Sequence, residues 1–510
     1  MTAPPLAVLR DTGRNRWANW HENFEQRLHK LYDVWNAEPN RSTLAGYNGT
    51  TRRLQQLLQE ALDTGRSVRA LGGGWSFTPV AATDGILLNT RPLNYRFPIA
   101  GDQVHPGFRG TGPLFFVQCG MSIAELNTYL ASKNLALPTS GASNGQTIAG
   151  ALSTGTHGAA LTVGSIPEYV VALHVITGPG RSVWLERQSY PAVADALAGY
   201  VQADLVRDDE LFDAAVVAFG SMGIIHGVVL EVTPLFRLNA WRKRVPLDDA
   251  LWGRIERNDY AGNTLPGAGG RMPHHLQFVI NPFDQGGGAF CTVMYREATC
   301  PAGSKPAEPF AKVAQGDGAL ELIGLLTDVA GDLTDDLAKL LTKLGYKEYD
   351  NRCGTPGQIF KDTTTRGHAA SAAMGVPLDR AREATALAVR AVQQAKAPAL
   401  VALRFVKASP ATLAFTRYAP VTCVLEVDGP ESARVRQAYR AAWNALDAAG
   451  IPYTFHWGKL NNLDRTSVRF ANRYGSAVQH WMDARARLLP TPELRRLFAN
   501  AFTDHLDLSD

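Results

Sequence analysis

The chain has 510 residues, which is too many for a single hydrophobic core, so two or more domains are expected. Hydrophobic residues make up 45% and charged residues 19%, which excludes a largely disordered chain. The net charge of +4 comes from interspersed acidic and basic residues without a long basic run. This pattern argues against a nucleic-acid-binding protein.

The cysteines and the apolar segments bear on compartment and metal chemistry. Five cysteines are irregularly spaced and form no Cys-x-x-Cys pair, which indicates neither a disulfide framework nor a zinc site. His274 and His275 are adjacent and would point to opposite faces of a strand, so no metal is expected there. The sequence shows no leader pattern and no apolar stretch near the roughly 20 residues of a membrane span. We therefore expect a cytoplasmic protein without a transmembrane segment.

The first half of the chain predicts alternating helices and strands. Residues 1–40, with three tryptophans among charged residues, predict a helical lead-in. A helix from Thr50 carries leucines on one face and ends at Gly65. A capping box at Ser122 and a cap at Asp208 open two further helices, the second ending near Phe219. Strands are predicted over residues 67–71, 85–89, 169–177, 181–185 and 227–233.

The character of the sequence changes near residue 235. A leucine stripe over residues 322–344 predicts a long helix with a core or interdomain face. Strands are predicted over 401–406 and 421–427, followed by a helix over 435–446. The last 60 residues hold the compact motif His456-Trp-Gly-Lys459 and a terminal helix.

A glycine triplet follows the strand that ends at Leu71. Gly72, Gly73 and Gly74 expose backbone N–H groups without side-chain obstruction, which suits a pyrophosphate. Ser76 adds a hydroxyl donor. Phe77 and the nearby proline break the Gly-x-Gly-x-x-Gly pattern of a nicotinamide-binding fold. A tight structural turn explains the triplet equally well.

The stretch Ser140–Gly158 is a sharper signal. Nearly every residue in it is small or carries a hydroxyl or amide group. A packed core would use larger apolar side chains, and a flexible linker would not contain Ile148, Leu152 and His157. The composition favours backbone pressed against a large flat polar ligand.

Two shorter segments are weaker signals when taken alone. Phe219–His226 is a helix end, a glycine turn and a strand start, and reads equally well as an ordinary connection. The tetrapeptide His456–Lys459 reads equally well as a surface loop.

Together and in this order, these four segments resemble the vanillyl-alcohol oxidase flavoprotein family. Within it the sequence is most similar to the aldonolactone oxidase group, which includes gulonolactone, arabinonolactone and alditol oxidases, and more distantly to flavin-linked cholesterol oxidases. The resemblance covers residues 40–235 and 450–510 better than the middle of the chain. The run from Gly145 to Gly158 is its specific part.

The resemblance implies an α+β fold with a two-part PCMH-type FAD-binding domain and a cap of antiparallel sheet and helices. The implied division is a lead-in over 1–39, an FAD-binding domain over 40–235, a cap over 236–450, and a segment over 451–510 that returns to the FAD-binding domain. The implied FAD-binding residues lie in the glycine loop, in the small-residue stretch and in the later turn: Gly72, Gly73, Gly74, Trp75, Ser76, Phe77, Gly141, Ser143, Gly145, Gln146, Thr147, Gly150, Ser153, Thr154, Gly155, Thr156, His157, Gly158, Gly223, Ile224 and Ile225.

The sequence departs from the family at two places. Many relatives carry a histidine in the glycine loop that bonds covalently to the flavin, and Trp75 holds that place here, so non-covalent FAD is expected. A tether from elsewhere, such as Cys119, stays open. Lactone and polyol oxidases have a glutamate two residues before an arginine on a cap strand, where this chain has Ala402 before Arg404. Glu426 on the next predicted strand is a candidate replacement.

The resemblance implies hydride transfer from a small hydroxylated substrate to flavin N5, with O2 as the expected acceptor. Lys459 would support the flavin near N1 and the C2 carbonyl, and Arg404 would hold the substrate oxygen. Glu426 or His456 would act as the base, although Glu426 reads equally well as a solvent-facing or salt-bridged residue. A dehydrogenase with another acceptor, and a flavin-binding homologue with a different biosynthetic role, are the alternatives.

Overall fold

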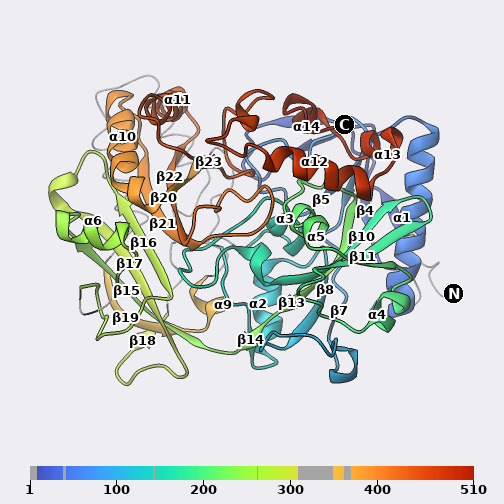
Figure 1. The fold of residues 1–510 in the computed structure, drawn as a ribbon, viewed down its shortest axis with the longest axis horizontal. Coiled ribbons are helices and arrows are strands. Elements are labelled where there is room, and N and C mark those ends of the chain that lie inside the picture. Colours follow the sequence, from blue (N-terminus) through green and yellow to red (C-terminus); the bar gives the residue numbers. More distant parts are fainter. Residues whose placement is uncertain are drawn as a thin grey trace.

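The computed structural model describes residues 8–37, 42–141, 144–260, 262, 264–307, 348–360 and 369–510. The helix expected over 322–344, and the predicted cofactor residue Ser143, lie outside these described residues. The described chain combines several β-sheets with helices packed against them (Figure 1). The α+β class predicted from the sequence is confirmed.

The N-terminal part builds a four-stranded sheet in the order β1-β4-β6-β5. Its strands are β1 (Leu9–Asp11), β4 (Lys30–Val34), β5 (Val68–Leu71) and β6 (Ile86–Asn89), and a separate hairpin joins β2 (Arg16–Ala18) to β3 (Glu25–Arg27). The helical lead-in predicted for residues 1–40 is therefore wrong for the part that the structure describes. The cause is nonlocal pairing, since β4 pairs with β6 more than 50 residues later and local sequence cannot show this.

Helix α1 (Leu44–Asp63) precedes β5. The Thr43 side chain caps it by accepting a hydrogen bond from the Gly46 N–H, so the helix starts earlier than the predicted Thr50. Its face of Leu54, Leu57 and Leu58 is buried as predicted. Gly65, with φ of +62°, follows the helix in a left-handed conformation that favours glycine.

A six-stranded sheet in the order β12-β11-β10-β13-β8-β7 forms the next layer. The Ser122 capping box opens α2 and Asp208 caps α5 as predicted, but α5 ends at Ala215, before Phe219. The strands and helices of this part are β7 (Arg96–Pro98), β8 (Leu114–Gln118), α2 (Ile123–Ala131), β9 (Leu135–Ala136), α3 (Ile148–Ser153), β10 (Val170–Gly178), β11 (Arg181–Glu186), α4 (Asp195–Tyr200), β12 (Asp204–Arg207), α5 (Asp209–Ala215), β13 (Ile224–Glu231) and β14 (Thr233–Pro234).

A nine-stranded sheet occupies the other half of the molecule, in the order β18-β19-β15-β17-β16-β21-β22-β20-β23 (Figure 1). The predicted strands at 401–406 and 421–427 and the helix at 435–446 are all present. The elements are β15 (Arg237–Val245), α6 (Asp249–Glu256), β16 (His275–Ile280), β17 (Ala289–Glu297), β18 (Lys305–Pro306), β19 (Tyr349–Gly354), α9 (Pro356–Ile359), β20 (Ala369–Pro377), α10 (Ala381–Gln394), β21 (Leu400–Lys407), β22 (Val421–Pro430), α11 (Ala433–Ala448) and β23 (Thr454–Phe455).

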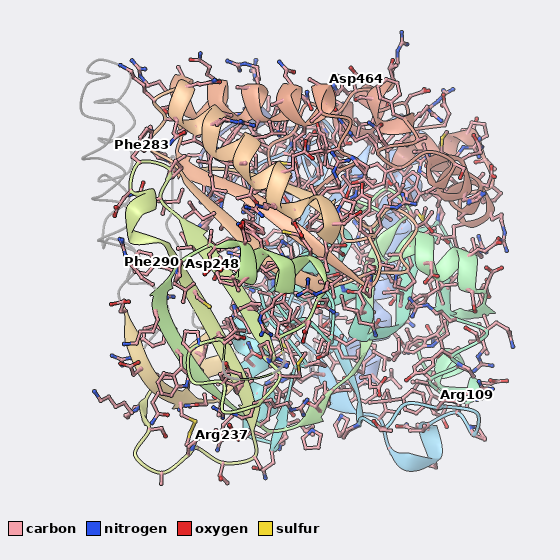
Figure 2. All side chains as sticks on the ribbon, turned by 60° about the vertical axis from the view of Figure 1, so that its left-hand side comes forward. Arg109, Arg237, Asp248, Phe283, Phe290 and Asp464 are labelled. Atoms are coloured by element: carbon pink, nitrogen blue, oxygen red, sulfur yellow. A yellow bond between two sulfur atoms is a disulfide. The ribbon has the colours of Figure 1, made fainter. Side chains whose placement is uncertain are left out.

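The two faces of this sheet differ in chemistry. Phe278, Leu403, Leu425 and Met374 lie side by side across β16, β21, β22 and β20 and are fully buried. Helices α10 and α11 pack against these strands, and Figure 2 shows helices in front of the sheet, with Asp248 at the start of α6. Because side chains alternate along a strand, the opposite face carries Gln277, Arg404 and Glu426 among small and apolar neighbours.

The C-terminal segment leaves the nine-stranded sheet and returns to the N-terminal half. It contains α12 (Ala477–Leu488), α13 (Pro492–Leu497) and α14 (Ala501–His505). The Trp481 indole donates to the Val217 carbonyl at 3.2 Å, and α13 lies beside α1 (Figure 1). The domain limits at 39, 235 and 450 stay a prediction.

One feature of the nine-stranded sheet corrects the sequence analysis. Cys300, after β17, forms a disulfide with Cys353 on β19. The irregular cysteine spacing did not indicate it, because the two residues are 53 positions apart and meet only through strand pairing. Among the described residues no helix is both long and apolar enough to cross a membrane.

Candidate active site

The glycine loop after β5 forms one wall of a cavity of about 310 Å³. Gly74 has φ of +72°, which turns the backbone in a way that side chains disfavour. Within the described chain, the backbone N–H groups of residues 73–76 donate no hydrogen bond. Successive free amides at a turn bind anions, so this loop can hold a phosphate group.

The small-residue stretch forms the second wall, built around the short helix α3. The Thr147 side chain caps α3 by accepting from the Gly150 N–H. Gly150 lines the cavity and is solvent-exposed, while the buried Gln146 Oε1 has no hydrogen-bond partner among the described residues. Free space beside a glycine and an unsatisfied acceptor indicate that a polar ligand completes this wall.

The glycines of these walls serve different purposes. A Cβ atom at Gly72, Gly73 or Gly145 would lie within 3.0 Å of Thr147, Trp75 or the Gly145 carbonyl, so these glycines allow the loops to pack on each other. Gly155 has φ of +73° and ends α3. A Cβ at Gly150 would meet only Thr147 Oγ1, at 3.1 Å, and would otherwise point into open space.

The segment His456–Lys459 joins the two halves of the site. His456 N–H donates to Ala373 O on β20 at 3.0 Å, and Phe77 N–H of the glycine loop donates to Gly458 O at 2.8 Å. Trp457 is fully buried, with its indole donating to Leu413 O at 2.7 Å. The segment is therefore not a surface loop.

The polar face of the nine-stranded sheet contributes an ion pair to the cavity. Glu426 stands directly opposite Ala402 on the neighbouring strand. Its Oε2 lies 3.2 Å from Arg404 Nη2, and its side chain is 1% exposed, so it is salt-bridged and not solvent-facing. The structure thus places a carboxylate beside Arg404, one strand away from Ala402.

His157 faces the same carboxylate. Its Nε2 lies 3.7 Å from Glu426 Oε1, while its Nδ1 lies 2.8 Å from the Gly158 carbonyl. A carbonyl can only accept, so Nδ1 carries the proton and Nε2 of the neutral ring is an acceptor. Neither Glu426 oxygen accepts a hydrogen bond from the described residues. The Glu426 carboxylate and His157 Nε2, which are both acceptors, and the Arg404 guanidinium therefore surround one point of the cavity.

The imidazoles of the cavity are neutral. Burial, followed by the charge of Lys459, lowers the pKa of His21 to about 3. Burial and then Arg404 lower the pKa of His157 to about 3. Burial and then His157 also hold the pKa of His456 well below its usual value. Arg404 and Lys459 therefore supply the positive charge of the cavity.

The cavity lining includes most predicted residues. All four predicted catalytic residues and sixteen of the predicted cofactor residues line it, whereas Gly145, Gly155, Gly158 and Ile224 do not. Sequence reasoning missed wall residues such as Trp17 and His21, whereas Cys119, which it kept open as a tether, also lines the cavity. The described residues hold no cluster of three or more side chains suited to a metal ion.

Comparison with known proteins agrees with this geometry. Residues 47–186 match the family model described as FAD binding domain. These residues therefore carry a PCMH-type FAD-binding domain, and the protein is a flavoprotein. This flavoprotein is 26% identical over 458 residues to L-gulono-1,4-lactone dehydrogenase of Mycobacterium tuberculosis, a match that covers 88% of the chain and 92% of the relative.

Two further similarities are more partial. A putative D-arabinono-1,4-lactone oxidase of Neurospora crassa is 29% identical over 205 residues, which cover 40% of the flavoprotein and 32% of the relative. The solved structure of cholesterol oxidase from B. sterolicum has a TM-score of 0.71 at 15% identity, and covers 99% of the flavoprotein and 100% of that chain. The match to cholesterol oxidase shows a shared fold.

The described residues fit FAD. Free loop amides and the Ser76 hydroxyl can hold its diphosphate, and the unsatisfied Gln146 oxygen and the open space at Gly150 suit its polar and flat parts. Lys459 and Arg404 lie at the wall contributed by the nine-stranded sheet and the C-terminal segment.

We predict that Gly150→Leu removes FAD binding without unfolding the chain. The new side chain would extend into the cavity, where only Thr147 Oγ1 is near its first carbon. The measurement is flavin absorbance of the purified variant together with its circular dichroism. Gly199→Leu is the control, because that glycine of α4 is exposed and no atom lies within 4 Å of its added carbon. A Gly150→Leu variant with full flavin content would show that Gly150 does not contact the cofactor.

Proposed function

We propose that this flavoprotein oxidises the CH–OH group of a small hydroxylated substrate, such as a sugar lactone, a polyol or a related alcohol, with O2 as the acceptor. The observation that carries the proposal is the position enclosed by Arg404, Glu426 and His157. An alcohol oxygen there accepts from the guanidinium and donates its proton to one of the two acceptors. FAD, when bound, takes up the hydride of the substrate carbon.

Glu426 is the better candidate for the base. Its two oxygens accept no hydrogen bond from the described residues, so a lone pair is available for the hydroxyl proton. The His456 Nδ1 already accepts from the Gly458 N–H at 3.0 Å. The neutral His456 ring therefore carries its proton on Nε2 and acts as a donor.

Arg404 and Lys459 have different tasks. Arg404 orients the substrate oxygen beside Glu426. Lys459 would supply fixed positive charge at the cofactor wall, which favours the negative charge that arrives with the hydride. The identity of relatives supports lactones as the first substrates to test: the relatives are named L-gulono-1,4-lactone dehydrogenase and D-arabinono-1,4-lactone oxidase.

The function is tested with a substrate panel of aldonolactones, polyols, simple alcohols and a sterol. We expect hydrogen peroxide to accumulate in air with at least one small polyhydroxylated substrate. Turnover with an artificial dye acceptor but without peroxide would assign a dehydrogenase. FAD-loaded protein that oxidises no member of the panel with either acceptor would favour the homologue with a different biosynthetic role.

We expect Glu426→Gln to lower kcat/KM by about 10²–10⁴-fold, the usual effect of losing a general base. The amide keeps the shape of the side chain, so FAD content should be unchanged. His456→Asn is the comparison, because its side-chain oxygen can still accept from Gly458, and we expect a smaller loss. A larger loss in His456→Asn than in Glu426→Gln would assign the base to the imidazole. Steady-state kinetics with matched flavin content measure both.

We propose that FAD is held without a covalent bond. Trp75 takes the place of the loop histidine, and its ring stacks on Trp20 with centroids 5.4 Å apart. An indole does not form the bond that a histidine nitrogen forms. Acid precipitation should therefore release the yellow chromophore into the supernatant. Colour that stays with the pellet would contradict this, and peptide mapping would then examine other nucleophiles of the cavity wall, such as His21 and Cys119.

A further inference from the structure

The Lys459 ammonium belongs to a hydrogen-bond network that leads away from the cavity. Its Nζ donates to Ser371 Oγ at 2.7 Å. The Ser371 hydroxyl in turn donates to Asp428 Oδ1. The cavity lining includes Lys459 but neither of the other two residues. This hydrogen-bond network therefore connects the cavity to the Asp428 carboxylate behind it.

The sheet register fixes this chain. Ser371 on β20 stands directly opposite Asp428 on β22. The Ser371 carbonyl also accepts from Leu460 N–H, one residue after the lysine, at 2.9 Å. The pairing of β20 with β22 and the hydrogen bond from Leu460 thus set the positions of the hydroxyl, the carboxylate and the lysine backbone. The flexible lysine side chain is therefore held at both ends.

The surroundings of the ammonium make this chain its main anchor. The Lys459 Nζ lies 5.1 Å from the centre of the Phe77 ring, a cation–π contact with the glycine loop. Among the described residues, Lys459 forms no direct ion pair within 4.0 Å and no other side-chain hydrogen bond than that to Ser371. An ammonium has three N–H donors, so two remain for the cavity.

We propose that Ser371 and Asp428 are positioning residues that hold the Lys459 ammonium at the cofactor wall. The inference rests on the proposed FAD site. The interposed hydroxyl matters, because a carboxylate in direct contact would pair with the ammonium and draw it out of the cavity. Asp428 orients the lysine through Ser371, while the Asp428 charge is kept out of direct contact with the ammonium by the serine hydroxyl. Without either group, the side chain regains its rotamer freedom and its charge spreads over several positions.

The test measures the midpoint potential of bound FAD and its affinity for sulfite, an anion that adds to flavins. Lys459→Met should shift the reduction equilibrium about a hundredfold, or about 60 mV to lower potential, and weaken sulfite binding. Ser371→Ala and Asp428→Asn should each shift it about tenfold, or about 30 mV, the effect of one charge-assisted hydrogen bond. Ser371→Thr keeps the hydroxyl and should restore the wild-type potential.

Two controls separate positioning from a general effect on the fold. Glu431→Gln removes another carboxylate of the same segment, one that pairs with Arg436 and accepts from Asn23, and it should leave the potential unchanged. In a Lys459→Met background, Ser371→Ala should cause no further shift, because the group it positions is gone. If Asp428→Asn does not fold, the Ser371→Ala and Ser371→Thr variants decide the test.

Several outcomes overturn the inference. Wild-type potential in Lys459→Met overturns it and leaves the substrate panel to judge the proposed function. A shift in Lys459→Met with none in Ser371→Ala shows that the lysine needs no positioning chain. An equal Ser371→Ala shift in the Lys459→Met background shows that the serine acts by another route. A wild-type chain that binds no FAD overturns the proposed function together with this inference.

Discussion

The site depends on one short backbone connection, the segment from His456 to Lys459. Its hydrogen bonds to Ala373 on β20 and to Phe77 in the glycine loop hold the nine-stranded sheet against the cofactor loops. The fully buried Trp457 fixes the segment from inside, packed against Tyr474 with ring centroids 4.9 Å apart. Because the same four residues carry Lys459, the connection that joins the two halves also sets the position of a cation between them.

The register of the sheet explains how a carboxylate on β22 can lie near the position that the family pattern assigns to an acid on β21. Ala402 and Glu426 are direct partners across β21 and β22, so their side chains leave the same face of the sheet about one strand spacing apart. The acid at position 426 lies 3.2 Å from the Arg404 guanidinium. The departure from the family pattern at residue 402 is therefore compatible with an acid–arginine pair, because sheet geometry places position 426 within reach of the same guanidinium.

The sequence predicts those parts of the molecule whose signal is local. The glycine loop and the Ser140–Gly158 stretch show their chemistry in composition, and the capping box at Ser122 shows a helix start. The strands of the N-terminal segment were misjudged because β4 gains its partner from β6, far along the chain. Trp17 and His21 were missed as wall residues for the same reason: only the folded chain brings them to the cavity, and neither sits in a motif. The disulfide of Cys300 with Cys353 likewise depends on strand pairing.

The long separation between the two sides of the site has a consequence for how the protein is made. Thr78 and Trp457, joined by a hydrogen bond at 2.5 Å, are 379 positions apart. At translation rates of about 5–20 residues per second, the glycine loop leaves the ribosome on the order of 20–80 s before its partner does. During that interval the loop lacks the contacts that residues 456–459 make with it in the folded chain. The glycine loop therefore gains its contacts with residues 456–459 only after most of the chain has been synthesised.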